Sequence, residues 1–338
     1  MFKRLWLGVT LILATSGFLL LSDMKQRAGN KSSVPRVAIL QFSSLGVLDD
    51  GVRGLMDQLK EDGYDAAHGA VVDLFNAQND MATSTSMSHE ITSGKYDYVF
   101  SISTNCLQSV ANANRDGKVK HIFGVVADPV AAKVGINPKD PMDHPKWMVG
   151  IGSLMPVSEM MEMARQFNPR VKRFGIPWNP SQANSQRYLE LAREAAAQMH
   201  VELLEGSVDN TAAVGEVTSS LISRGAETIV VVGDVTVALA IDAVVSECRK
   251  GKIPALTLMP ADVKRGALAG AGADFYQVGR QMGQLGTRVM RGEDTARIPI
   301  SYELPKYYAF NLTVLPTLKD HWTIPDPLLA AAKILVRQ

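Results

Sequence analysis

From about Arg36 onward the chain alternates short apolar segments with longer segments of helical periodicity, and this alternation limits the fold more than any other feature. The apolar segments, such as RVAILQF at 36–42 and TIVVVG at 228–233, are continuous runs. Such runs are typical of parallel strands that helices cover on both faces. The segments between them, such as 48–63, place apolar residues on one helical face. The pattern therefore predicts βαβ units.

The expected elements form two sets. The first comprises strands at 36–42, 70–75, 96–103 and 120–126, with helices at 48–63, near 80–93 and from Asn105. Residues 131–147 contain three prolines and predict an irregular loop. The second set comprises helices at 157–168, 183–199, 211–224 and 236–250, with strands at 173–178, 201–208, 228–233 and 254–259. With 338 residues, the chain is long enough for two domains, so we expect an α/β protein of two doubly wound, Rossmann-like lobes.

The loops that follow the strands are the expected ligand-binding segments, because ligands bind beyond the carboxyl ends of parallel strands. These loops are rich in Ser, Thr and Asn, and each precedes a helix whose first N–H groups favour an anionic ligand group. A single loop of this kind can equally be an ordinary helix cap. Six of them at one cleft favour a binding site, whose candidate residues in these loops are Ser43, Ser103, Thr104, Asn105, Asp128, Trp178, Asn179, Ser181, Asn184, Asp234, Thr236 and Asp262.

The charged ends of a ligand suggest roles for some of these residues. Ser103, Thr104 and Asn105 at a helix N-terminus are expected to hold a carboxylate. Asp234 is expected to pair with an ammonium group, with Asp128 as the second choice. The alternative for Asp234 is that it only caps the helix that follows it.

The loop WNPSQANS (178–185) carries uncharged polar groups and one large aromatic side chain. Asn179 or Ser181 is expected to cap the next helix, while Asn184 and the remaining polar groups face the cleft. Uncharged groups can orient a ligand without the cost of burying a charge. Trp178 is expected either to stack on an apolar part of the ligand or to pack between the lobes.

Composition and missing motifs exclude several other functions. Lysine plus arginine (35) nearly equals aspartate plus glutamate (34), without long runs of one sign, which argues against a nucleic-acid partner. The two cysteines are far apart and the six histidines are scattered, so neither a disulfide nor a metal site is expected. The chain contains no GxSxG, Walker lysine loop or HExxH motif. We therefore expect a protein that binds a small molecule without a cofactor and is not an enzyme.

The N-terminus predicts export. Lys3 and Arg4 precede an apolar run at 5–21, and a polar stretch follows it. Residues 1–30 are therefore expected to be a signal peptide or an N-terminal membrane anchor. The rest of the chain would then work in the periplasm or another extracytoplasmic space, either released or anchored to the inner membrane by residues 5–21.

Several stretches resemble the ABC transporter substrate-binding proteins of the tryptophan or aromatic amino-acid uptake type, which are type I periplasmic binding proteins. They are ILQF, NAQNDMAT (76–83), FGVVADPVAA (123–132), WNPSQANS and ADVKRGALAGAGADFYQVGRQMG (261–283). The resemblance extends over about residues 36–318. It implies that a small polar or amino-acid-like ligand is captured and delivered to a permease coupled to an ATPase. A receptor domain for a membrane signalling partner is the alternative.

The resemblance also implies how the lobes are divided. It implies three hinge crossings, near 152–156, 271–275 and 301–306. The first lobe would comprise residues 34–153 and 273–302, and the second would comprise 154–272 and 303–338. Tyr276, just past the second crossing, is expected either to close over the ligand or to pack against its neighbours.

Overall fold

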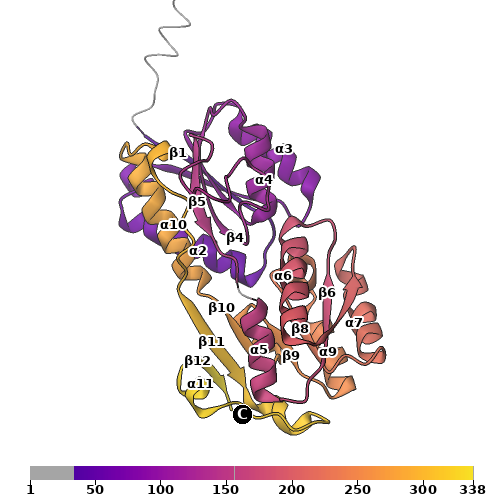
Figure 1. Cartoon of the computed structure of the whole chain (residues 1–338). Coiled ribbons are helices and arrows are strands. Elements are labelled where there is room, and N and C mark those ends of the chain that lie inside the picture. The colour runs from indigo at the N-terminus through magenta and orange to yellow at the C-terminus, as the bar shows by residue number, and fades with distance from the viewer. Residues whose placement is uncertain (1–33, 156, 338) are drawn as a thin grey trace, which may run out of the picture.

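The computed structural model describes residues 34–155 and 157–337, which form two α/β lobes, each built on one sheet (Figure 1). The predicted leader lies outside the described residues. Within the described part of the chain, none of the helices combines the length and the apolar character needed to cross a bilayer.

The first lobe contains a five-stranded sheet in the order β2-β1-β3-β4-β5, and all its neighbouring strands are parallel. Its strands are β1 (Arg36–Gln41), β2 (Val71–Asn76), β3 (Tyr98–Ile102), β4 (Lys120–Val126) and β5 (Met148–Gly152). Helices α2 (Gly46–Glu61) and α10 (Phe275–Met290) pack together against this sheet, and α3 (Met81–Thr92) packs with α4 (Thr104–Ala113). Helix α10 thus joins the first lobe from a distant part of the sequence (Figure 1).

The second lobe contains a seven-stranded sheet in the order β12-β11-β10-β9-β8-β6-β7. Its strands are β6 (Arg173–Trp178), β7 (Glu202–Ser207), β8 (Thr228–Val231), β9 (Ala255–Thr257), β10 (Ala269–Ala273), β11 (Lys306–Asn311) and β12 (Ala332–Val336). Its helices are α5 (Val157–Phe167), α6 (Ala183–Met199), α7 (Val214–Ser223), α8 (Val235–Leu239), α9 (Ile241–Gly251) and α11 (Asp326–Ala330). Strands β10 and β11 are antiparallel, so this sheet is mixed.

The chain passes between the lobes in three places. It leaves the first sheet after β5 and enters α5, and it returns from β10 to α10. Ser301 then forms a parallel bridge with Ile151 beside β5, and the chain continues into β11 of the second sheet.

The predicted α/β fold with two doubly wound lobes is confirmed, and several elements differ from the prediction. Strands β5, β10, β11 and β12 were not expected. The helix expected at 236–250 is interrupted at Ala240 and forms α8 and α9, and the helix expected at 211–224 begins as a 3-10 turn at Thr211–Ala213. The segment 131–147 contains turns and no regular element, as predicted.

Strand β10 was missed because its sequence, AGAGA, lacks the large apolar side chains of a typical strand. Its glycines are required by packing. A Cβ atom on Gly272 would lie 2.2 Å from the Leu258 carbonyl oxygen, and one on Gly270 would lie 2.5 Å from Pro260 Cα. The backbone of 258–260 therefore packs directly on β10, a contact that local sequence patterns do not reveal.

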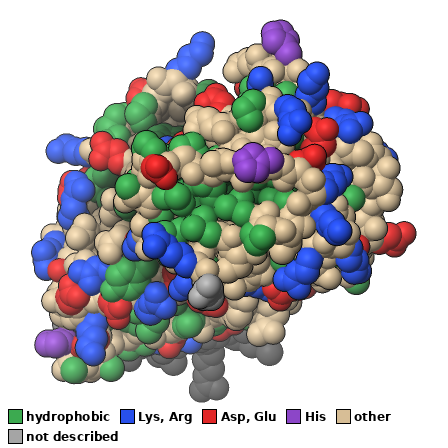
Figure 2. Space-filling model, turned by 90° about the horizontal axis from the view of Figure 1, so that it is seen from below, with side chains coloured by type: hydrophobic (Ala, Val, Ile, Leu, Met, Phe, Trp, Pro, Cys, Tyr) green, Lys and Arg blue, Asp and Glu red, His purple; other side chains and the backbone are tan. Residues whose placement is uncertain are grey.

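The lower end of the molecule, where the chain ends, belongs to the second lobe (Figure 1). Seen from below, hydrophobic side chains gather in the middle of this face, and Lys and Arg side chains surround them (Figure 2). Apolar side chains of the C-terminal elements, such as Leu328 and Leu335, pack half-buried against the core.

Candidate functional site

A cavity lies between the two lobes, beyond the carboxyl ends of strands from both sheets. Its cavity volume is about 60 Å³, small beside the ~300–1,000 Å³ that is usual for small-molecule sites. Both lobes and the segment that joins them contribute to its wall. The lining residues are Leu45, Val47, Leu48, Ser103, Thr104, Asn105, Val125, Ala127, Ser153, Met155, Asn184, Tyr188, Gly233, Asp234, Val235, Leu258, Met259 and Phe275.

The N-terminus of α4 forms the polar part of the first-lobe wall. Ser103 caps this helix, because its hydroxyl oxygen accepts the N–H of Cys106 at 3.2 Å. Thr104 and Asn105 are the first two helical residues, so their N–H groups have no acceptor within the helix. Together with the helix dipole, these groups favour an anionic ligand atom at this point.

The backbone is strained at two residues of the same wall. Ser103 has φ of 104° and Val125 has φ of 54°, although neither is glycine. A positive φ is unusual for any residue with a Cβ, and especially for a β-branched one such as Val125. Conformations of this kind cost roughly 1–3 kcal/mol each and cluster at functional sites, where the surrounding structure enforces them.

Asp234 lies in the second-lobe wall and is 1% exposed. One carboxylate oxygen accepts the N–H of Val237 at 2.9 Å, which caps α8, and the other accepts the N–H of Asn179 at 2.7 Å. Burial raises the pKa of Asp234, and hydrogen bonds from Ser185 and the backbone act in the opposite direction. The capping role is therefore present in the structure, and pairing with a ligand ammonium stays a prediction.

Three residues expected in the cleft do not line the cavity: Asn179 and Thr236 are buried elsewhere, and Ser181 is exposed. Asn179 and Gln182 both donate side-chain hydrogen bonds to the Thr236 hydroxyl, at 2.9 and 2.8 Å. The Ser181 hydroxyl donates to the Asn179 side chain at 2.6 Å. These bonds lie within the loop after β6 or join it to Thr236 at the start of α8. The expected capping of the next helix by Asn179 or Ser181 is wrong, because Gln182 occupies the N-cap position of α6 and no side chain caps it.

Asn184 of the same loop does line the cavity, and it is 5% exposed. Its amide nitrogen donates to the Gly233 carbonyl at 2.5 Å, and its amide oxygen has no hydrogen-bond partner among the residues described. One turn further along α6, the hydroxyl of Tyr188 accepts the Met155 N–H at 3.3 Å. Burial raises the pKa of Tyr188 to about 12, so this side chain is a neutral phenol in the cavity wall.

Four other candidates do not line the cavity. Ser43 is buried elsewhere, and Trp178, at the end of β6, packs half-buried against the core. Asp262 accepts a hydrogen bond from the Thr257 hydroxyl at 3.1 Å, and burial raises its pKa to about 6. Asp128 instead pairs with Arg187 of the other lobe, with 3.1 Å between Nε and the carboxylate.

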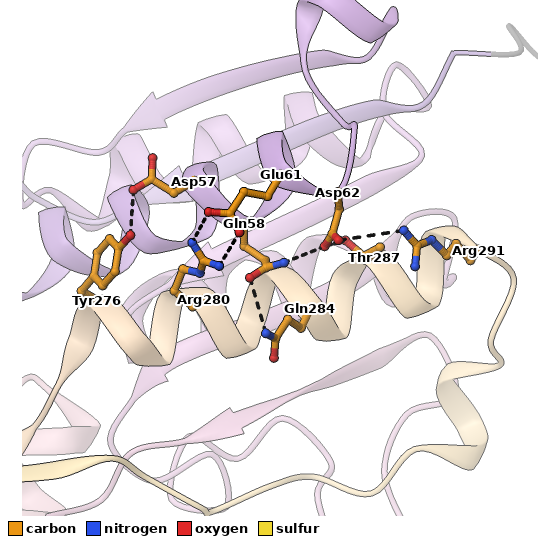
Figure 3. A network of polar contacts seen from close by, with 9 residues as sticks. All are labelled: Asp57, Gln58, Glu61, Asp62, Tyr276, Arg280, Gln284, Thr287 and Arg291. Carbon is orange, nitrogen blue, oxygen red and sulfur yellow. Dashed lines mark hydrogen bonds and ion pairs between the residues drawn. The ribbon is translucent and has the colours of Figure 1, made fainter.

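Tyr276 also lies outside the cavity. Its hydroxyl donates to Asp57 of α2 at 2.9 Å (Figure 3). The Arg53 guanidinium lies over its ring. The neighbouring Phe275 lines the cavity in its place. Successive residues of a helix point about 100° apart, which directs these two side chains to different surroundings.

The apolar part of the wall was not predicted from the sequence, because only polar residues and one tryptophan in the loops were interpreted as ligand-binding candidates. It comprises Leu45, Val47, Leu48, Val125, Ala127, Met155, Val235, Leu258, Met259 and Phe275. Most of these residues also lie shortly after the ends of strands, and this position is the feature that they share in the sequence. A cavity with one anion-binding end, one acidic wall and a large apolar lining suits a ligand that is zwitterionic at one end and apolar over the rest.

Within 34–155 and 157–337, no group of three or more His, Cys, Asp or Glu side chains could hold a metal ion. Cys106 and Cys248 are both buried, and burial raises the pKa of both thiols well above the usual range.

Comparison with known proteins gives consistent matches. Residues 36–335 match the family model described as ABC transporter substrate binding protein. The tyrosine-binding protein of Clostridioides difficile is 26% identical over 265 residues, which cover 78% of this chain and 75% of that protein. A solved structure of an ABC domain in complex with L-Trp, from Streptococcus pneumoniae, has a TM-score of 0.82 and 25% identity. A conserved domain protein from Vibrio cholerae has a TM-score of 0.83 and 27% identity, and each match covers 90% of this chain and 100% of the other.

Proposed function

Because the chain belongs to the ABC transporter substrate-binding protein family, its role is to bind a solute for a transporter, and we propose that this solute is an aromatic L-amino acid. The family is one of solute-binding proteins and not of enzymes. Two relatives of this chain are named for aromatic amino acids, one for tyrosine and one for its complex with L-Trp.

The observation that carries the proposal is the division of the cavity wall. The α4 N-terminus lies in one lobe and Asp234 with Asn184 in the other, and apolar side chains form most of the remaining lining. An α-amino acid has its carboxylate and ammonium on one carbon atom, so it can contact both polar walls at once. An aromatic side chain would then fill the apolar part, where Phe275 and Tyr188 offer ring contacts.

Calorimetric titration and thermal unfolding of the protein test this proposal. L-Trp, L-Tyr and L-Phe are compared with L-Ala, L-Leu, a sugar and a nucleoside. A ligand at one hundred times its Kd stabilises the folded state by about 2.7 kcal/mol, which raises the melting temperature by several degrees. We expect the aromatic amino acids to do so, and L-Ala to bind much more weakly. If only a ligand of another class binds, the proposed substrate is wrong.

We further propose that the two lobes, divided at the three crossings given above, close on the ligand and that the closed form is recognised by a permease coupled to an ATPase. The division into 34–153 plus 273–302 and 154–272 plus 303–338 is supported by the two separate sheets. Closure about these crossings would follow from ligand contacts with both walls.

The site of action that we propose is outside the cytoplasm, with residues 1–30 directing export and residues 5–21 able to act as an anchor. Cell fractionation of the full chain tests this. We expect it in the periplasmic fraction if the leader is cleaved and in the inner-membrane fraction if it is kept, whereas a cytoplasmic location would contradict the proposal.

A further inference from the structure

The side chain of Asn184 has a determined orientation in the cavity wall. Its neighbour, the Gly233 carbonyl, can only accept a hydrogen bond, so the amide nitrogen of Asn184 must be the atom that faces it. The amide oxygen is therefore on the other side of the group. The residue lines the cavity, is 5% exposed, and lies in the first turn of the long helix α6.

This amide oxygen has no partner among the described residues. Buried polar atoms nearly always have one, and a buried acceptor without a donor is unfavourable. Most of the other side chains that line the cavity are apolar, such as those of Leu258, Met259 and Phe275. The missing donor is thus expected to come from whatever occupies the cavity.

Asp234 is in a different situation. Each of its carboxylate oxygens already accepts a backbone N–H, from Val237 and from Asn179. A ligand could reach it only by sharing these oxygens. Its carboxyl group nevertheless lies in the same wall as Asn184, and in its ionised form it favours a cationic donor over a neutral one.

We propose that the amide oxygen of Asn184 accepts a hydrogen bond from the ammonium group of the bound amino acid, and that Asp234 is a positioning residue that shapes this wall. The inference rests on the proposed function, because it assumes an amino acid in the cavity. The carboxylate of the same ligand lies at the α4 N-terminus of the other lobe. Asn184 then distinguishes amino acids from carboxylic acids that lack the amino group.

The test compares L-tryptophan with indole-3-propionate, which is the same molecule without its ammonium group. The measured quantity is the ratio of the two dissociation constants, determined by calorimetry. In the unmodified protein we expect L-tryptophan to bind at least tenfold more tightly. An unmodified protein that binds both equally well overturns the proposal, whether or not any variant folds.

Asn184→Ala removes the acceptor, and we expect the ratio to fall at least tenfold, equivalent to about 1.4 kcal/mol. Asp234→Asn should reduce the ratio less, because the direct contact remains. Gln198→Ala, an exposed position near the end of the same helix, is the control and should leave the ratio unchanged.

The outcomes separate the two proposals. If Asn184→Ala keeps the ratio while Asp234→Asn abolishes it, the ammonium is bound by Asp234 and the inference about Asn184 is wrong, although the proposed function stands. If neither ligand nor any other aromatic amino acid binds the unmodified protein, the proposed function itself is wrong and the inference falls with it.

Discussion

Three aspartates that follow strands, Asp128, Asp234 and Asp262, illustrate how differently one residue type is used in this protein. Asp128 pairs with an arginine of the other lobe, and Asp234 caps a helix at the cavity. Asp262 is bonded to Thr257, and no cation pairs with it within 4 Å among the described residues. The residues that lie nearby in space determine each environment, whereas the sequence context is similar in that each aspartate occurs in a short loop after a strand.

The stability contribution of Asp262 should depend on pH. Burial raises its pKa from 3.8 to about 6, so the folded protein holds this proton more tightly than the unfolded chain does. The resulting stabilisation is complete below pH 4 and is lost as the pH rises to about 6. Asp262→Asn keeps an oxygen that can accept from Thr257 but removes the ionisation.

We therefore compare the free energy of unfolding of Asp262→Asn with that of the unmodified protein. The difference in favour of the variant should be larger at pH 7 than at pH 4, by roughly 2–3 kcal/mol, because one pKa unit corresponds to about 1.4 kcal/mol. Urea unfolding of both proteins at the two pH values measures this difference. A difference that does not change with pH would show that folding does not raise the pKa of Asp262.

The element with the most unusual packing is α10, which follows a strand of the second sheet but packs on α2 of the first lobe. The helices meet along glycines. A Cβ atom on Gly279 would lie 2.1 Å from the Gly51 carbonyl oxygen, and one on Gly54 would lie 2.0 Å from that of Tyr276. Polar contacts run along the same interface (Figure 3), and they involve Asp57, Gln58, Glu61, Asp62, Tyr276, Arg280, Gln284, Thr287 and Arg291.

Gly279→Ala should destabilise the protein, because α10 must move away from α2 to make room for one methyl group. Overpacking of this kind costs about 1–3 kcal/mol, partly offset by the better helix propensity of alanine. Gly46→Ala is the matched control, since nothing lies within 4 Å of the added Cβ at the start of α2. Chemical unfolding should show a lower free energy of unfolding for Gly279→Ala. For Gly46→Ala the free energy of unfolding should change little or increase slightly. Equal effects would mean that the two helices can separate freely.

At the scale of the whole molecule, the Asp128–Arg187 ion pair connects the two lobes. Asp128 follows β4 of the first sheet and Arg187 belongs to α6 of the second lobe. The two side chains are 14% and 30% exposed, so the pair is only partly screened by solvent. It is therefore expected to favour the closed arrangement modestly.

Asp128→Asn keeps an oxygen that can accept the N–H groups of Val130 and Ala131 but removes the charge. An ion pair of this exposure is worth up to about 1 kcal/mol, so ligand affinity should fall by up to about fivefold. Small-angle scattering should show that saturating ligand makes the unmodified protein more compact, and that the ligand-free variant is more extended. Glu205→Gln, which breaks a pair with Arg193 inside the second lobe, should change neither quantity. Unaltered affinity and dimensions in Asp128→Asn would assign the pair no part in closure.

The alternation of strands and helices could be predicted from the sequence because it depends on residues that are close together in the chain. The spacing of their apolar side chains shows which face of each helix or strand is buried. RVAILQF and TIVVVG therefore predicted β1 and β8, and the polar loops after β3 and β8 predicted that Ser103 and Asp234 reach the cavity. Strand β10 could not be predicted, because its sequence AGAGA consists of small residues that allow the backbone of 258–260 to pack directly on it.

The composition of the cavity was decided by tertiary structure, for a related reason. A side chain lines the cavity only if two conditions are met. It must project from the cavity-facing side of its helix, strand or loop, and the packing of the opposite lobe must leave it at the cavity. Phe275 and Tyr276 are adjacent in sequence, yet one lines the cavity and the other is bonded to α2. Asn179 and Asn184 belong to the same short sequence stretch, WNPSQANS, yet the side chain of the first is bonded to α8 and its own loop and that of the second has an oxygen without a partner among the described residues. Such differences arise between residues far apart in the chain, where local periodicity carries no information.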